Sequence, residues 1–203
     1  MTDLDPFYLI VGHVGRLELL VPQGVKLVQL RIKDQPEAEV RRQIARARDF
    51  CAVHKARLVV NDYWQIALDL SCGFVHLGQE DMDNADFAAL RRAGVRFGLS
   101  THDEAELERA LALEPAYVAL GPVFPTLLKQ MKWGPQGFDR VRQWKARVGD
   151  TPLVGIGGLT PERLPGLFAA GADCAAVVTD IQQAPDPEAR CRDWIAATRE
   201  YAR

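Results

Sequence analysis

The stretch Leu153-Val-Gly-Ile-Gly-Gly-Leu-Thr-Pro161 places a short apolar run, a pair of glycines and a helix start in direct succession. The apolar run Leu153–Gly158 predicts a β-strand. Thr160 followed by Pro161 is typical of a helix N-terminus, because threonine is a favoured N-cap residue and proline suits the first helical position. The segment therefore predicts one strand-to-helix unit.

The same succession recurs along the chain. The other predicted strands are Tyr8–Gly12, Lys26–Lys33, Arg57–Asp62, Gly73–Gly78, Arg96–Thr101, Tyr117–Phe124 and Cys174–Asp180. Several are apolar almost throughout, which is typical of parallel strands that are covered on both faces. Eight central strands are therefore expected.

Helical patterns lie between these strands. The clearest runs from Glu37 to Ala56, where apolar residues repeat at helical spacing. The other predicted helices are Gly15–Val21, Tyr63–Ser71, Asp86–Ala93, Glu104–Leu113, Phe138–Val148, Pro161–Ala170 and Pro187–Tyr201. Thr101-His-Asp-Glu104 has the spacing of a capping box, which would place Thr101 at a helix N-cap.

This alternation predicts an α/β protein with a single (β/α)8 TIM barrel. No linker or low-complexity tract divides the 203 residues, so residues 1–203 are expected to form one domain. A doubly wound open sheet is the alternative. Periodicity does not separate the two architectures, because both are built from right-handed βαβ units.

Composition excludes several classes of protein. The chain has 25 Lys+Arg against 27 Asp+Glu, a net charge of −2, so it lacks the broad positive field that nonspecific nucleic-acid binding or an anionic membrane requires. No apolar run is long enough to span a bilayer, and the acidic N-terminus does not resemble a secretion signal. The four cysteines are far apart, which predicts reduced thiols in a cytoplasm and no zinc site. Whether copies associate into a homo-oligomer stays open.

The strand over 26–33 ends in polar residues that alternate with apolar ones. Alternation sends Gln29, Arg31 and Lys33 to one face and Leu30 and Ile32 to the other. An internal salt bridge or solvent exposure of the long side chains is the alternative. Two cations and an amide at the end of one strand favour a site that binds an anion.

Carboxylates follow the next two strands. Asp62 comes after Asn61 at the end of one strand, and Asp81 follows the other. Each could equally serve as a helix cap or part of an acidic loop. Together at one barrel mouth they could hold Mg²⁺, a hard cation that takes oxygen ligands and would bridge to a phosphorylated substrate.

The last two strands supply a second candidate anion site. Gly157, Gly158 and Thr179 lie where barrels frequently bind phosphate. Glycine lets backbone amides approach phosphate oxygens, and a helix N-terminus favours negative charge. Lys129, in the loop 125–136, is a further cation, although most loop lysines are simply exposed.

Taken together, these segments resemble thiamine-phosphate synthase along essentially the whole chain. The matching motifs are Gln29-Leu-Arg-Ile-Lys-Asp34, Val60-Asn-Asp-Tyr-Trp64, Val75-His-Leu-Gly-Gln-Glu-Asp81, Gly98-Leu-Ser-Thr-His102, Gly121-Pro-Val-Phe-Pro-Thr126, Pro135-Gln-Gly137 and Gly155-Ile-Gly-Gly158. The resemblance implies a barrel enzyme that joins hydroxymethylpyrimidine diphosphate to hydroxyethylthiazole phosphate, or its carboxylated form. Thiamine phosphate and pyrophosphate would be the products.

The resemblance also implies residue roles. The segment Gln29, Leu30, Arg31, Ile32 and Lys33, with Asn61, would hold the pyrimidine diphosphate, while Asp62 and Asp81 would bind Mg²⁺. Ser100 and Lys129 would contact the diphosphate, and Thr126, Leu127, Leu128, Gly158, Val178 and Thr179 would form the thiazole-phosphate site. Arg31, Lys33, Ser100 and Lys129 would act in catalysis by stabilising the leaving group in a dissociative reaction. No nucleophile is required.

One departure from the family pattern stands out. The strand-six loop usually reads Thr-x-Thr-Lys, whereas Leu128 occupies the second threonine position here. Loss of a hydrogen bond to a charged group costs about 1.5–3 kcal/mol, so thiazole-phosphate binding is expected to be weaker. Two rival functions follow: a thiazole isomerase that uses His102 as acid or base, and a noncatalytic phosphate-binding barrel.

Overall fold

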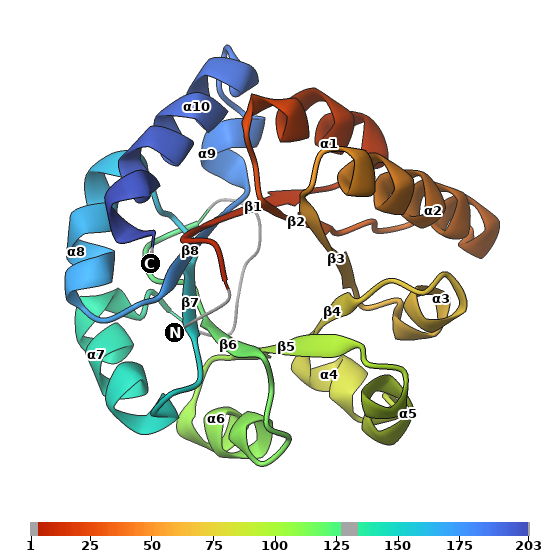
Figure 1. Cartoon of the computed structure of the whole chain (residues 1–203). Coiled ribbons are helices and arrows are strands. Elements are labelled where there is room, and N and C mark those ends of the chain that lie inside the picture. Colours follow the sequence, from red (N-terminus) through yellow and green to blue (C-terminus); the bar gives the residue numbers. More distant parts are fainter. Residues whose placement is uncertain (1–3, 127–133, 203) are drawn as a thin grey trace.

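The computed structural model describes residues 4–126 and 134–202. Eight parallel strands close into a barrel in chain order (Figure 1). They are β1 (Phe7–Val11), β2 (Leu27–Leu30), β3 (Arg57–Asn61), β4 (Phe74–Leu77), β5 (Arg96–Thr101), β6 (Tyr117–Leu120), β7 (Leu153–Ile156) and β8 (Cys174–Val177). The fold is therefore the predicted (β/α)8 barrel and not the open doubly wound sheet.

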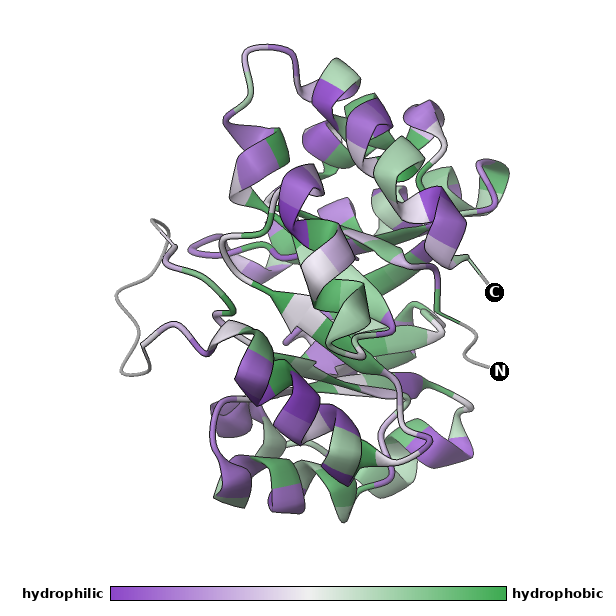
Figure 2. Cartoon of the chain, turned by 90° about the vertical axis from the view of Figure 1, so that its left-hand side faces the viewer, coloured by the Kyte–Doolittle hydropathy of each residue, from purple (hydrophilic) through white to green (hydrophobic). Residues whose placement is uncertain are grey.

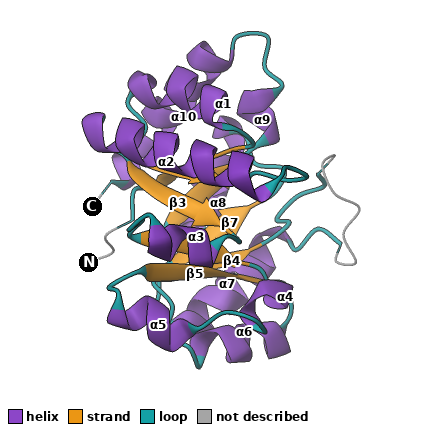
Figure 3. Ribbon diagram, turned by 90° about the vertical axis from the view of Figure 1, so that its right-hand side faces the viewer, coloured by secondary structure: helices purple, strands orange, loops and turns teal. Residues whose placement is uncertain are grey.

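Helices form the outer ring around these strands (Figure 3). They are α1 (Val14–Leu20), α2 (Glu37–Val53), α3 (Trp64–Asp69), α4 (Gln79–Met82), α5 (Phe87–Arg92), α6 (Glu104–Leu111), α7 (Gly137–Val148), α8 (Leu164–Ala169), α9 (Thr179–Gln182) and α10 (Pro187–Thr198). Three 3₁₀ turns are η1 (Val21–Gln23), η2 (Pro161–Arg163) and η3 (Arg199–Tyr201). The four-residue helices α4 and α9 were not predicted, since so short a segment shows no periodicity.

The barrel closes where its first strand meets its last. Phe7 pairs with Ala175 and Leu9 with Val177, so β1 is hydrogen-bonded to β8 on one side and to β2 on the other. No strand of the barrel is left with a free edge.

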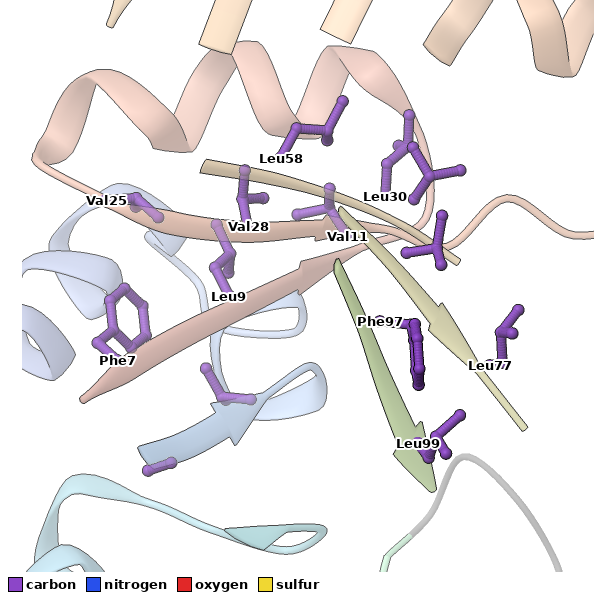
Figure 4. Packing of buried hydrophobic residues seen from close by; sticks show 14 of the residues in the cluster. Phe7, Leu9, Val11, Val25, Val28, Leu30, Leu58, Leu77, Phe97 and Leu99 are labelled. Carbon is purple, nitrogen blue, oxygen red and sulfur yellow. The ribbon is translucent and has the colours of Figure 1, made fainter. Parts of the chain in front are cut away.

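Each strand is covered on both faces, which explains the nearly continuous apolar runs. In β1, Phe7, Leu9 and Val11 face the helices, where they join a large buried cluster (Figure 4). Tyr8 and Ile10 face the barrel interior and join a smaller cluster. Figure 2 shows hydrophobic residues along the strands and hydrophilic residues on the outer parts of the helices. Alternation by two therefore separates an outer layer from an inner one.

The predicted capping box at Thr101 is wrong. Asp103 is the N-cap of α6, and its carboxylate accepts a hydrogen bond from the Glu106 amide at 2.9 Å. Thr101 still belongs to β5 and is fully buried. Its hydroxyl donates to the Ala119 carbonyl at 3.0 Å and accepts from Trp144 Nε1 at 2.9 Å. Because these contacts to β6 and α7 occupy the hydroxyl, it does not cap α6.

The four cysteines, Cys51, Cys72, Cys174 and Cys191, are free and buried, as expected of reduced thiols. Within residues 4–126 and 134–202, no helix is long and apolar enough to cross a membrane. The cytoplasmic location stays a prediction.

Candidate active site

A cavity of about 1150 Å³ opens at the end of the barrel where the strands end and the loops to the helices begin. Its walls contain nearly all the candidate residues that the structure describes. From the sequence-based set, the lining residues are Gln29, Arg31, Lys33, Asn61, Asp62, Asp81, Ser100, Thr126, Gly158, Val178 and Thr179. Leu127, Leu128 and Lys129 lie outside the described residues.

The predicted alternation at the end of β2 is confirmed. Gln29, Arg31 and Lys33 line the cavity, whereas Leu30 and Ile32 are buried in the cluster between the strands and the helices. The side chains of Leu30 and Ile32 therefore do not face the cavity, and any role in substrate binding would fall to their backbone.

The two cations at this edge differ in their partners. Lys33 Nζ lies 2.5 Å from Asp62 Oδ2, so the salt-bridge interpretation is correct for Lys33. The Arg31 guanidinium makes no ion pair or side-chain hydrogen bond within the described parts of the chain, although its backbone amide donates to the Val11 carbonyl at 2.8 Å. Among residues 4–126 and 134–202, the positive charge of Arg31 at the cavity is thus not paired with an acid.

Asp62 and Asp81 come from neighbouring units and face the same part of the cavity. Asp62 follows β3 with a left-handed backbone (φ 64°), and Asp81 in α4 accepts a hydrogen bond from the Gly78 amide at 3.0 Å. Burial, and then the nearby Asp62 carboxylate, raise the pKa of Asp81. Two neighbouring carboxylates repel each other when both are ionised, so a cation bound between them would stabilise the pair.

These carboxylates fit a magnesium ion that keeps several other ligands. The residues described contain no group of three His, Cys, Asp or Glu side chains that could hold a metal. Mg²⁺ usually binds through one or two carboxylates and completes its octahedron with water and substrate phosphate. Asp62 and Asp81 therefore match the two carboxylates that a Mg²⁺ site commonly uses, and they do not form a closed structural metal site.

The floor of the cavity is polar and was not predicted in full. His76 Nε2 lies 2.8 Å from Ser100 Oγ, and His76 Nδ1 lies 2.7 Å from the Tyr117 hydroxyl. Burial lowers the pKa of His76 to about 4, so its imidazole is neutral at pH 7. The available signal was a histidine between apolar residues in a strand predicted to be buried on both faces.

Asn61 contributes an unused hydrogen-bond donor. Its side chain lines the cavity and is 4% exposed, yet Nδ2 has no hydrogen-bond partner among the described residues. A buried amide without a partner is unfavourable by about 1–3 kcal/mol. A ligand that accepts a hydrogen bond at this position would remove that penalty.

The predicted phosphate-binding glycines hold two loops together at the opposite side of the cavity. The Phe124 amide donates to the Gly157 carbonyl at 3.0 Å. Gly157 and Gly158 both have positive φ, 99° and 60°. A Cβ on Gly158 would lie 2.5 Å from the Pro125 carbonyl oxygen, so only glycine fits there.

Replacing this glycine tests its role. Gly158→Ala would push the loop that contains Thr126 away from the loop after β7, and we expect the KM for a substrate whose phosphate binds at these glycines to rise about tenfold. The reason is that misplaced backbone donors lose about one charge-assisted hydrogen bond. Steady-state kinetics measure the change, and Gly134→Ala, where no described residue lies within 4 Å of the added carbon, is the control. Equal KM values in both variants would contradict the assignment.

A closed (β/α)8 barrel with a polar, partly cationic cavity at the carboxyl ends of its strands belongs to the class of TIM-barrel enzymes whose sites sit at that end. The family model described as "Thiamine monophosphate synthase" matches residues 8–181. A curated thiamine-phosphate synthase of Rhizobium etli is 62% identical over 98% of this chain and 97% of its own length. One from Klebsiella pneumoniae is 44% identical over 94% of this chain and 87% of its own.

A solved structure agrees with the fold. The thiamine phosphate pyrophosphorylase from Pyrococcus furiosus superimposes with a TM-score of 0.84, covering 97% of this chain and 96% of that one, at 24% identity. The chain belongs to the thiamine monophosphate synthase family, and it is an enzyme.

Proposed function

We propose that the protein joins 4-amino-2-methyl-5-hydroxymethylpyrimidine diphosphate to hydroxyethylthiazole phosphate, or its carboxylated form. Thiamine phosphate and pyrophosphate are the products. The observation that supports this most directly is that one cavity contains two separate groups of residues whose chemistry suits anions. Arg31 and Lys33 lie beside the acid pair, and the Gly157–Gly158 loop lies near Thr179. A volume of about 1150 Å³ is enough for two small substrates together.

The residues of the first region suit a dissociative reaction. The bond between the pyrimidine methylene carbon and the diphosphate oxygen breaks first, and the thiazole nitrogen then attacks the resulting cation. Arg31 and Lys33 stabilise the negative charge that collects on the departing pyrophosphate, and Ser100 donates to it. Asn61 orients the pyrimidine through its free amide. By sequence, Lys129 is a further cation for the leaving group.

Asp62 and Asp81 would hold Mg²⁺ in this scheme. When bound, the ion supplies positive charge to the diphosphate oxygens and makes pyrophosphate a better leaving group. Lys33, now 2.5 Å from Asp62, is placed to contact the same diphosphate.

The acid pair can be tested through the metal requirement. We expect Asp81→Asn to raise the Mg²⁺ concentration for half-maximal activity about tenfold, because one charged ligand becomes neutral while an oxygen that accepts from Gly78 is kept. Magnesium titration of the activity measures this. Asp83→Asn is the matched control. The Asp83 carboxylate does not line the cavity, and it lies 2.5 Å from the Arg109 guanidinium. An unchanged magnesium requirement would remove Asp81 from the site.

The function itself is tested by supplying both substrates to the purified protein, with Mg²⁺ and with a chelator. We expect thiamine phosphate and pyrophosphate to form in equal amounts only when Mg²⁺ is present. Leu128→Thr, which restores the hydroxyl of the family pattern, is assayed beside the natural chain. A lower KM for the thiazole substrate in that variant would show that Leu128 weakens this half of the reaction.

Two other outcomes would replace the proposal. Isomerisation of a thiazole carboxylate phosphate without Mg²⁺ or pyrimidine diphosphate would favour the isomerase, in which His102, 2.7 Å from Glu106, would be the acid or base. Binding of either substrate without release of pyrophosphate, in both proteins, would favour a noncatalytic barrel.

A further inference from the structure

A continuous chain of hydrogen bonds crosses the barrel interior from β2 to β5. Gln29 Nε2 donates to the Tyr8 hydroxyl at 2.8 Å, and the Tyr8 and Tyr117 hydroxyls are 3.0 Å apart. The Tyr117 hydroxyl lies 2.7 Å from His76 Nδ1, and His76 Nε2 lies 2.8 Å from Ser100 Oγ. The first four residues are buried, and Ser100 lines the cavity.

The end at Gln29 gives this chain a direction. An amide NH₂ group can only donate, so the Tyr8 oxygen accepts. The buried Tyr8 proton then needs an acceptor of its own, and the Tyr117 hydroxyl, 3.0 Å away, provides one. Tyr117 in turn directs its proton to the next partner, His76 Nδ1. Each hydroxyl thus passes on the direction that the amide sets.

The direction fixes the tautomer of His76. A neutral imidazole has one N–H, and Nδ1 is already an acceptor, so the proton resides on Nε2. Both ring nitrogens face hydroxyl groups and neither faces a carboxylate, which suits a neutral ring. His76 Nε2 therefore donates to Ser100 Oγ. The hydroxyl proton of Ser100 is then free to point into the cavity.

We propose that His76 is a positioning residue, held in the Nε2–H tautomer by the chain that begins at Gln29, and that it commits the Ser100 hydroxyl to donating into the cavity. The acceptor on the substrate rests on the proposed function, in which an oxygen of the leaving diphosphate lies there. A donor oriented in advance stabilises the charge that develops on that oxygen without reorganising first.

The tautomer can be measured in the protein without any substrate. Long-range ¹H–¹⁵N correlation spectra of the ¹⁵N-histidine protein distinguish Nε2–H from Nδ1–H, and His76→Gln identifies the His76 signals by their loss. We expect Nε2–H to be the predominant form. A predominant Nδ1–H form would overturn the proposal, whatever the enzyme is found to catalyse.

Reversing the first donor tests what sets the tautomer. Gln29→Glu puts an ionised carboxylate, which can only accept, in place of the amide NH₂. Tyr8 would then donate to it, Tyr117 to Tyr8, and His76 Nδ1 to Tyr117, so we expect the tautomer to invert. The spectrum is recorded at a mildly alkaline pH at which the ¹³C signal of the introduced carboxyl shows that it is ionised.

Two companion variants separate this relay from a general disturbance. In Tyr8→Phe the chain from Gln29 is cut, so we expect Nε2–H to lose its predominance over Nδ1–H. In the double variant Tyr8→Phe with Gln29→Glu the chain is cut as well, and we expect the tautomer ratio of Tyr8→Phe alone, without inversion. An inverted tautomer in the double variant would show that Gln29 does not set the tautomer of His76. A tautomer that stays Nε2–H in Gln29→Glu would show the same.

A kinetic test follows if the synthase activity is found. His76→Leu removes the donor to Ser100, and we expect kcat to fall about tenfold, the value of one hydrogen bond to a charged group. His76→Gln can place an amide NH₂ near the position of Nε2 and should recover most of that loss. Equal kcat values for the two folded variants would show that His76 only fills space.

Discussion

Arg31→Ala is expected to lower the kcat/KM for pyrimidine diphosphate by about 10²–10³-fold. Removal of one preorganised charge that stabilises a developing anion typically has an effect of this size. Arg31 lines the cavity and has no ion pair within the described residues, so its charge is fully available to a substrate. Initial rates of pyrophosphate release at varied diphosphate concentrations give the value.

Two further variants make this result specific. Arg31→Lys keeps the charge but loses the bidentate geometry of the guanidinium, and should recover part of the activity. Arg41→Ala removes an arginine on the outer helix α2 that pairs with Asp69 at 2.7 Å, and should leave the kinetics within twofold of the natural chain. Normal turnover by Arg31→Ala would show that the positive charge of Arg31 does not stabilise the leaving group.

The second large effect is expected on the stability of the fold. A Cβ added to Gly98 would lie 2.1 Å from Cζ of the Tyr117 ring, which is fully buried in the barrel interior. The ring also packs against Phe74 and His76, with centroids 5.8 and 5.6 Å away, and therefore has nowhere to move. We expect Gly98→Ala to lower the free energy of unfolding by about 3 kcal/mol, the upper end for overpacking.

Thermal and urea unfolding measure this change, and a loss of about 3 kcal/mol corresponds to roughly 6–12 °C in Tm for a chain of this size. Gly73→Ala is the control, because no residue that the structure describes lies within 4 Å of the added carbon. If Gly98→Ala unfolds at the same temperature as the natural chain, Tyr117 is not confined as the structure shows.

The sequence was a good guide to the barrel because its physical signals were local. Seven of the eight strands lie within predicted strand segments, and β1 begins one residue before the predicted Tyr8–Gly12. Each longer helix falls at a predicted segment. Closure was not predictable from these signals, since it depends on pairing between Phe7 in the first strand and Ala175 in the last. The short helix α9 was missed because four residues make one turn.

At the site, the charged residues and the amides of Gln29 and Asn61 were predictable, whereas the buried tyrosine hydroxyls were not. Alternation correctly placed Arg31 and Lys33 on the cavity side, because it depends only on strand geometry. Tyr8 and Tyr117 read as ordinary apolar residues of buried strands, and only the closed barrel brings their hydroxyls to 3.0 Å. Contacts across the interior are set by tertiary structure and leave no local pattern.

The seam between β1 and β8 also bears on how the chain is made. Residues 7–11 are synthesised before the seven strands that follow, and their partner strand, residues 174–177, is the last of the eight to be made. Until β8 arrives, a growing chain has an unpaired strand edge at both ends of its partial sheet, and such edges attract other chains. Ribosome-bound fragments that stop before Cys174 would therefore be targets for chaperones, although the finished barrel has no open edge.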